Sequence, residues 1–151
     1  MTEYHWLDLS SNECDQSHQL EYEILRKPWG LPPEKDEFFE EWILGAFEGN
    51  HMVGTSAART IMKNGNTYFK ILYFVVDESY RQQKIGEKML QLLERKAEEL
   101  GIDKIYMEVF SSAVYYFTHY GYVQKGCSYI PAFIPIDHLE IYKNIKKDKS
   151  L

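Results

Sequence analysis

Six residues, Arg81-Gln82-Gln83-Lys84-Ile85-Gly86, decide how this chain folds. They stand between an apolar stretch, Lys70–Val76, that predicts a β-strand, and an amphipathic stretch, 85–100, that predicts a helix. The first N–H groups of a helix have no partner within it, and the helix dipole places partial positive charge there. Two of the six residues are basic, and Lys88 adds a third positive charge. This junction therefore predicts an anion site that fits a phosphorylated cofactor.

The predicted helix has one apolar face and one charged face. Gly101 follows its last apolar residue directly, at the place where a left-handed helix cap is usual. The next stretch, Lys104–Phe110, is rich in branched and aromatic residues and predicts a second strand. Strand, helix and strand together predict a βαβ unit with two parallel strands. The apolar residues of the helix recur at three- and four-residue spacing: Ile85, Met89, Leu92, Leu93, Ala97 and Leu100.

The segment Leu72–Tyr122 resembles the cofactor-binding half of the GNAT superfamily of N-acyltransferases. Members of that superfamily carry an Arg/Gln-x-x-Gly-x-Gly/Ala loop that holds the pyrophosphate of acetyl-coenzyme A, and a later aromatic-x-x-x-Gly-Phe pattern. In this chain Gly86 matches the second glycine of the loop, and Gly121-Tyr122 matches the Gly-Phe pair. Lys84 stands at the first glycine, so an ordinary backbone angle is expected there.

The resemblance implies a GNAT-type α/β fold, in which a mixed, mostly antiparallel sheet splits in the middle and helices flank it. It implies acetyl-coenzyme A as co-substrate and no metal. Main-chain groups of Phe74, Val75 and Val76 would bond to the pantetheine arm of that molecule. The resemblance places the pyrophosphate on the loop and the helix start: Arg81, Gln82, Gln83, Lys84, Ile85, Gly86 and Glu87.

The resemblance also suggests a proton donor for the leaving thiolate. Members often place a tyrosine four residues before the Gly-Phe pair, and here that position is Phe117, which has no hydroxyl. Tyr116 precedes it, whereas Tyr120 shares its helical face more closely. A phenol can donate a proton to sulfur as the thiolate forms. We take Tyr116 as the candidate acid, with Tyr115 and Tyr120 as alternatives.

An amine attacks only when it is unprotonated, so the reaction also needs a base. The candidates are Glu108, Glu41 and His138, and a chain of water molecules could replace all three. The acidic run Asp36–Glu41 either rims an amine pocket or is an ordinary solvated face.

These features predict an N-acetyltransferase that moves an acetyl group from acetyl-coenzyme A to a primary amine by direct attack in a ternary complex. Neither cysteine stands in a nucleophilic arrangement, which disfavours a covalent intermediate. We favour a small molecule over a protein as the acceptor. Two other functions stay open: a non-catalytic module that binds or senses acyl-coenzyme A, and a protein-interaction domain with a vestigial cleft.

Length and composition set broad limits. A chain of 151 residues predicts a single domain spanning 1–151, and a homodimer is compatible with it. A net charge of −6 argues against nucleic acid as a partner. No apolar run approaches the ~18 residues that cross a bilayer, and no signal peptide is visible, so we expect a cytoplasmic protein away from membranes. Cys14 and Cys127 lack metal or redox spacing, and we expect two reduced thiols.

The remaining stretches predict strands around two hairpins. A helix is expected over 15–25 with Asp15 or Ser17 as its cap, followed by a loop over 28–33, because prolines stop both helices and strand pairing. The tail Lys146–Leu151 is expected to fray. Turn signals stand at 48–50 and 63–66, and strands are expected at 4–9, 42–47, 52–61, 122–124 and 139–142.

Overall fold

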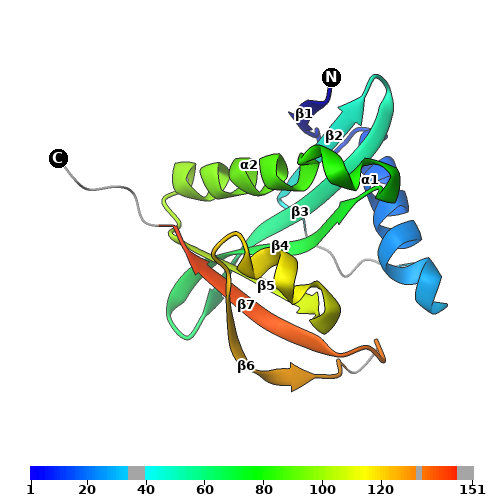
Figure 1. Cartoon of the computed structure of the whole chain (residues 1–151). Helices are drawn as coiled ribbons and strands as arrows, with labels where there is room; N and C mark the ends of the chain where they lie inside the picture. Colours follow the sequence, from blue (N-terminus) through cyan, green and yellow to red (C-terminus); the bar gives the residue numbers. More distant parts are fainter. Residues whose placement is uncertain (34–39, 132–133, 146–151) are drawn as a thin grey trace. The chain divides into compact units, whose positions relative to one another are not determined.

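The computed structural model describes residues 1–33, 40–131 and 134–145 (Figure 1). The strands of this part join one mixed, mostly antiparallel sheet, as predicted, and their order in it is β1-β2-β3-β4-β5-β7-β6. The α-helices are α1 (Glu13–Glu21), α2 (Ile85–Glu99) and α3 (Val114–Thr118). The strands are β1 (Glu3–Trp6), β2 (Trp42–Glu48), β3 (His51–Lys63), β4 (Asn66–Val76), β5 (Lys104–Phe110), β6 (Val123–Tyr129) and β7 (His138–Asn144).

The chain gathers in two compact units. Unit 1 comprises 1–59 and 72–95, and unit 2 comprises 60–71 and 96–151. The single domain expected from chain length stays a prediction. Only Glu40 and Glu41 of the predicted acidic run fall within the described residues, and the tail Lys146–Leu151 lies outside them.

Both predicted hairpins form. Gly49, with φ +60°, lies in the turn between β2 and β3. Asn64 and Gly65, with φ 53° and 79°, form the turn between β3 and β4. Two successive residues with positive φ are typical of the type I′ turn, whose twist matches that of the strands it joins. Local turn chemistry therefore sets the connections on both sides of β3.

In unit 1, two helices cover opposite faces of β3. The hydroxyl of Thr55 lies 2.6 Å from that of Ser17 on α1. The preceding residue, Gly54, faces α2, because a Cβ built there would lie 3.0 Å from Sδ of Met89 and 3.3 Å from Cγ2 of Ile85. Successive residues of a strand point to opposite faces, so the two contacts are on opposite sides of the sheet. Gly54 thus lets the first turns of α2 approach β3 closely.

The helix α2 begins and ends close to the predicted residues. Ile85 and Met89, on its apolar face, are at most 1% exposed. Gly101 follows the helix with φ +76°, which is the predicted left-handed cap. The N–H of Ile102 donates to the carbonyl oxygen of Ala97 at 2.9 Å, which is the long bond of a Schellman motif.

The start of α1 differs from the prediction. The helix begins at Glu13, after Asn12, and Asn12 makes no side-chain cap bond. The prediction that Asp15 or Ser17 caps this helix is therefore wrong. Ser17 is instead fully buried, and its hydroxyl forms hydrogen bonds with side chains of β3 and β4.

The helical region also runs further than predicted. It continues from α1 into a π-helical turn, Tyr22–Arg26, and a 3-10 turn, Lys27–Trp29, so the loop begins later than residue 28. Pro28 fits the 3-10 turn because the first turn of a helix needs no N–H group from that residue. The π-helical turn places Nε of Arg26 at 3.1 Å from Oε2 of the buried Glu21, five residues earlier.

In unit 2, β7 runs antiparallel between β5 and β6. β4 and β5 pair in parallel over Phe69–Ile71, opposite Ile105–Met107, as the βαβ unit predicts. β6 extends beyond the predicted residues 122–124. Its register against β7 shifts between Lys125 and Tyr129, where Gly126 has φ +83°.

Gly54→Ala should destabilise the protein by about 1–3 kcal/mol, which is the usual cost of overpacking a filled site. The new methyl group would press on Met89 and Ile85 and displace the first turns of α2. Urea unfolding measures the change. Combining Gly54→Ala with Met89→Ala should cost less than the sum of the two single changes. Strictly additive costs would mean that the close approach does not limit this site.

Candidate functional site

The predicted anion loop lies at the junction of β4 and α2 in unit 1. β4 ends at Val76, a 3-10 turn spans Glu78–Gln83, and α2 begins at Ile85. The candidate cofactor residues 74–76 and 81–87 therefore occupy one strand end, one turn and one helix start. This arrangement leaves the N–H groups at the start of α2 without acceptors inside the helix.

Lys84 adopts a left-handed backbone, with φ 58° and ψ 25°, so the ordinary backbone angle expected there is wrong. Its carbonyl oxygen accepts a bond from the N–H of Lys88 at 3.2 Å, which makes Lys84 the first acceptor of α2. The left-handed conformation costs a non-glycine residue about 1–2 kcal/mol. The turn into α2 demands this conformation, and the lysine adopts it despite that cost.

Two side chains tie the loop to the end of β4. Oδ1 of Asp77 accepts the N–H of Ser79 at 2.9 Å and caps the 3-10 turn. Nε of Arg81 donates to the carbonyl oxygen of Val76 at 3.0 Å. Gly86 follows in the first turn of α2 and is buried. The loop is therefore held by its own bonds, which is the kind of preorganisation that anion binding favours.

A buried network of hydroxyls links α1, β3 and β4. Oγ of Ser17 lies 2.6 Å from both Oγ1 of Thr55 and the hydroxyl of Tyr73. Oγ of Ser56 donates to the carbonyl oxygen of Tyr73 at 2.7 Å. Burial raises the pKa of Tyr73 far above its usual range, so its phenol stays protonated. The network fixes β4 just before the candidate residues Phe74–Val76. No local sequence pattern predicts this network.

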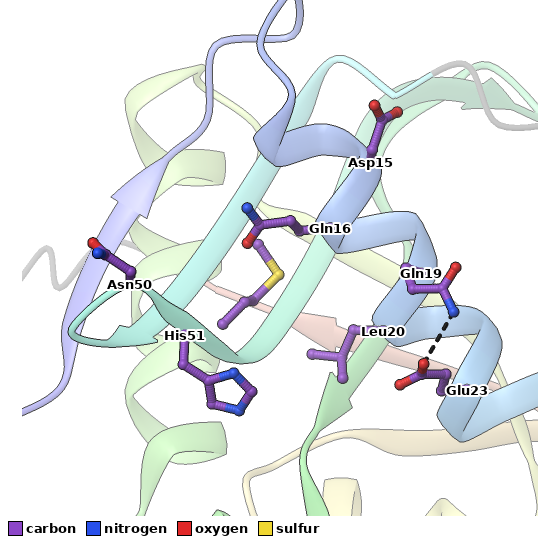
Figure 2. Close-up of a pocket in the computed structure, with 8 residues that line it drawn as sticks. Asp15, Gln16, Gln19, Leu20, Glu23, Asn50 and His51 are labelled. Carbon is purple, nitrogen blue, oxygen red and sulfur yellow. Dashed lines mark hydrogen bonds between the residues drawn. The ribbon is translucent and has the colours of Figure 1, made fainter.

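A pocket of about 510 Å³ opens beside α1 and the β2–β3 turn (Figure 2). Figure 2 shows Gln19 donating to Glu23 on α1, with Nε2 and Oε1 3.0 Å apart. His51 connects the pocket to the loop, since its Nε2 lies 4.0 Å from Oδ2 of Asp77 and its ring 6.2 Å from that of Tyr80. The pocket is lined by Asp15, Gln16, Gln19, Leu20, Glu23, Asn50, His51 and Met52.

The candidate acid Tyr116 lies on α3 in unit 2. It is 41% exposed, and its ring packs against Phe117 at 5.1 Å and Tyr120 at 5.2 Å between ring centres. Phe117 is only 5% exposed. Tyr115 is 84% exposed. Of the aromatic residues on α3, Tyr116 combines a hydroxyl with a fixed ring and access to solvent.

Two of the candidate bases lie together in unit 2. The hydroxyl of Tyr129 donates to the carboxylate of Glu108, and Nζ of Lys70 lies 3.0 Å from Oε1 of Glu108. Burial alone would raise the pKa of Glu108, but these two donors outweigh it and lower the pKa. A carboxylate held in this way is a weak base. His138 begins β7 with 7% of its surface exposed, and its Nδ1 lies 2.7 Å from the carbonyl oxygen of Ile136.

The third candidate base, Glu41, lies in unit 1, where its backbone N–H donates to Ala58 at 3.0 Å just before β2 begins. In the part of the chain that the structure describes, no cluster of three His, Cys, Asp or Glu side chains is arranged to hold a metal ion. No helix of that part is long and apolar enough to cross a bilayer. The two cysteines are unbonded to each other, with Cys14 buried and Cys127 exposed.

A model of the acetyltransferase (GNAT) family matches residues 3–122. The chain belongs to the GNAT family. Members of this family use acyl-coenzyme A. The loop and helix start described above therefore occur in a member of the family that the sequence predicted. The family resemblance stated from the loop, the helix and the Gly121-Tyr122 pair is confirmed.

Solved structures share this GNAT fold. An acetyltransferase of the family from Staphylococcus aureus Mu50 superposes with a TM-score of 0.75 at 21% identity, covering 97% of this chain and 100% of that one. FeeM, an N-acyl amino acid synthase from uncultured soil microbes, gives 0.81 at 12% identity, covering 96% and 91%. Arabidopsis thaliana Naa50, in complex with the bisubstrate analogue CoA-Ac-MVNAL, gives 0.75 at 17% identity, covering 95% and 98%. At these identities the likeness shows the fold alone.

Lys84→Gly should stabilise this GNAT protein by about 1 kcal/mol, because glycine adopts the left-handed backbone without a steric cost. Lys84→Ala is the matched control, since it removes the same charge and keeps the cost. Thermal or urea unfolding of both variants measures the difference. Equal stability of the glycine and alanine variants would contradict the left-handed assignment at residue 84.

Proposed function

We propose that this protein transfers an acetyl group from acetyl-coenzyme A to a primary amine of a small molecule. The observation that carries the proposal is the open N-terminus of α2, which Lys84 begins in a left-handed turn within a GNAT chain. The amine attacks the thioester carbonyl directly in a ternary complex. Much of the rate then comes from holding the two reactants together.

The pyrophosphate end of acetyl-coenzyme A binds at the start of α2. The N–H groups of Ile85, Gly86 and Glu87 are donors without acceptors in the helix, and the helix dipole favours negative charge there. Gly86 has no side chain to obstruct the phosphate oxygens. Arg81 and Lys84 add positive charge, and Arg81 has two terminal nitrogens besides the Nε that bonds to β4. These residue types and this backbone fit a diphosphate.

The thioester end depends on main-chain groups and on a proton donor. Main-chain groups of Phe74–Val76, at the end of β4, bond to the pantetheine arm. An N–H group near Val76 polarises the thioester carbonyl, which stabilises the negative charge that develops on its oxygen. Tyr116 then donates its proton to the leaving thiolate.

One observation favours a second function, a non-catalytic module that binds or senses acyl-coenzyme A. Phe117 occupies the position where family members often have a tyrosine, and its ring is almost fully buried. Release of free thiol from acetyl-coenzyme A with a panel of amines separates the alternatives. Turnover would indicate the enzyme, and binding without turnover would indicate the sensor. If the protein neither binds nor turns over acetyl-coenzyme A, the protein-interaction domain is the remaining alternative.

Coenzyme A should raise the melting temperature. A ligand that binds only the folded state adds RT ln(1 + [L]/Kd), which is about 2.7 kcal/mol at one hundred times Kd. Gly86→Val should reduce the coenzyme A-induced rise in melting temperature by more than it lowers the melting temperature of the ligand-free protein. The reason is that its branched side chain would crowd the phosphates. Differential scanning fluorimetry measures both effects. An unchanged melting temperature at millimolar coenzyme A would contradict the proposal. A wild-type rise in the melting temperature of Gly86→Val would mean that the phosphates bind elsewhere.

Tyr116→Phe should lower kcat by about 10²-fold or more if the phenol is the acid. The change keeps the ring that packs against Phe117 and Tyr120, so stability should barely move. Tyr120→Phe is the matched control and should retain most activity. Thiol release under saturating acetyl-coenzyme A gives kcat for each. If both variants keep wild-type kcat, the thiolate leaves without help from either phenol.

A further inference from the structure

The pocket beside α1 and the β2–β3 turn is built entirely from unit 1. Its described lining residues fall within 15–23 and 50–52, so no part of unit 2 is needed to form it. Its described lining also shares no residue with the candidate cofactor residues 74–76 and 81–87. The volume of about 510 Å³ lies within the range of small-molecule sites, about 300–1,000 Å³. The pocket is therefore large enough, and open enough to solvent, to take a small ligand of its own.

One wall of this pocket carries a carboxylate at each end. Figure 2 shows Asp15 and Glu23 at the two ends of the wall that α1 and its continuation contribute, with Gln19 and Leu20 between them. The two acidic residues are eight positions apart, which is about 12 Å along a helix. A single metal ion needs its ligand oxygens within about 2.6 Å, so these two carboxylates cannot share one. They are spaced instead for the two ends of an elongated cation.

The wall between the two carboxylates offers an amide oxygen and apolar surface. Nε2 of Gln19 donates to Oε1 of Glu23 at 3.0 Å, which leaves the amide oxygen of Gln19 as a further acceptor. Leu20 packs against the buried core cluster that contains Met52, and both of these residues line the pocket. Apolar surface of this kind is stabilised when methylene groups cover it. The middle of the pocket therefore suits an aliphatic chain.

The basic side chains nearest to this wall are paired with other carboxylates. No lysine or arginine is among the described residues that line the pocket. The basic residues within 13–26 are His18 and Arg26. Nε2 of His18 bonds to the carboxylate of Glu40, and Nε of Arg26 lies 3.1 Å from Oε2 of Glu21. The negative charge of the two carboxylates at the ends of the wall is therefore not neutralised by their own helix.

The wall across from α1 does not oppose a cation either. Asn50 and His51 contribute to it from the β2–β3 turn and the start of β3. Asn50 has an amide oxygen that can accept a hydrogen bond. Nε2 of His51 lies 4.0 Å from Oδ2 of Asp77, so a third carboxylate accompanies this imidazole.

We propose that this pocket binds a linear aliphatic diamine in its doubly charged form. One ammonium group lies at Asp15 and the other at Glu23, and the methylene chain between them lies over Leu20 and Met52. Each ammonium group has three N–H donors, which match the carboxylate and amide oxygens of the pocket. The site does not depend on the proposed function, because no part of coenzyme A takes part in it.

Calorimetric titration of the full chain with hexane-1,6-diamine, without coenzyme A, tests the site. An ionic strength of about 0.15 M screens charges more than about 8 Å away. Hexylamine has the same chain and one charge, and it should bind about 2–5-fold more weakly, which is the usual worth of one exposed charge contact. Asp15→Asn and Glu23→Gln should each weaken diamine binding by about the same factor and remove its advantage over hexylamine.

Glu13→Gln is the matched control. It removes the same charge from the first turn of α1 at an exposed residue outside the described lining of the pocket. This variant should bind the diamine like the wild type and keep its advantage over hexylamine. An equal loss in Glu13→Gln would mean that the diamine is attracted by the acidic helix in general, and the proposed site would then be wrong.

Two further results would overturn the site: no measurable diamine binding, or equal affinity of the wild type for the diamine and hexylamine. The wild type also supplies a measurement that needs no variant. Its backbone amide resonances for residues 15–23 and 50–52 should shift at saturating hexane-1,6-diamine. Shifts that leave these residues unchanged would place the amine elsewhere. None of these outcomes bears on coenzyme A binding, so the site and the proposed function can fail separately.

Discussion

The left-handed backbone at Lys84 is the constraint on which the passage from β4 into α2 depends. The chain must leave β4, pass through one 3-10 turn and enter α2 with its first N–H groups unpaired. A left-handed residue interrupts one helical segment and lets the next begin in a new direction. From that point the first turns of α2, at Ile85 and Met89, run against Gly54 of β3. Loop geometry and helix packing are therefore set by the same residue.

The strand that precedes this turn is held from several sides. The hydroxyls of Ser17 and Ser56 bond to the side chain and the carbonyl of Tyr73, and Arg81 bonds to the last residue of β4. Fully paired polar groups in a buried place rigidify their surroundings, whereas half-paired ones are costly. The end of β4 is consequently held in one position.

Features with a local cause could be predicted from the sequence. The apolar spacing of α2, its cap at Gly101, the run of β5 and both hairpin turns each depend on residues close together in the chain. The family followed from the same region. The roles given to Phe74–Val76, to the loop and to Tyr116 stay predictions.

Features with a distant cause could not be predicted. Ser17 was expected to be a helix cap. Its burial is explained by its hydrogen-bond partners Thr55 and Tyr73, which are 38 and 56 residues away in the sequence. The positive φ of Lys84 was missed because a lysine gives no sign of the turn that forces it. The orientation of His138 likewise depends on strand pairing with Phe110 and Tyr129.

The register shift in β6 has a consequence for how copies of this chain meet one another. β6 is the last strand of the sheet order, so its outer edge carries backbone groups that could pair with another chain. The shift between Lys125 and Tyr129, with Gly126 at φ +83°, breaks the straight row of groups that such pairing needs. Lys125 adds a charge that an incoming strand would have to desolvate. Crowded chains of this protein are thereby protected against edge-to-edge aggregation on the β6 side.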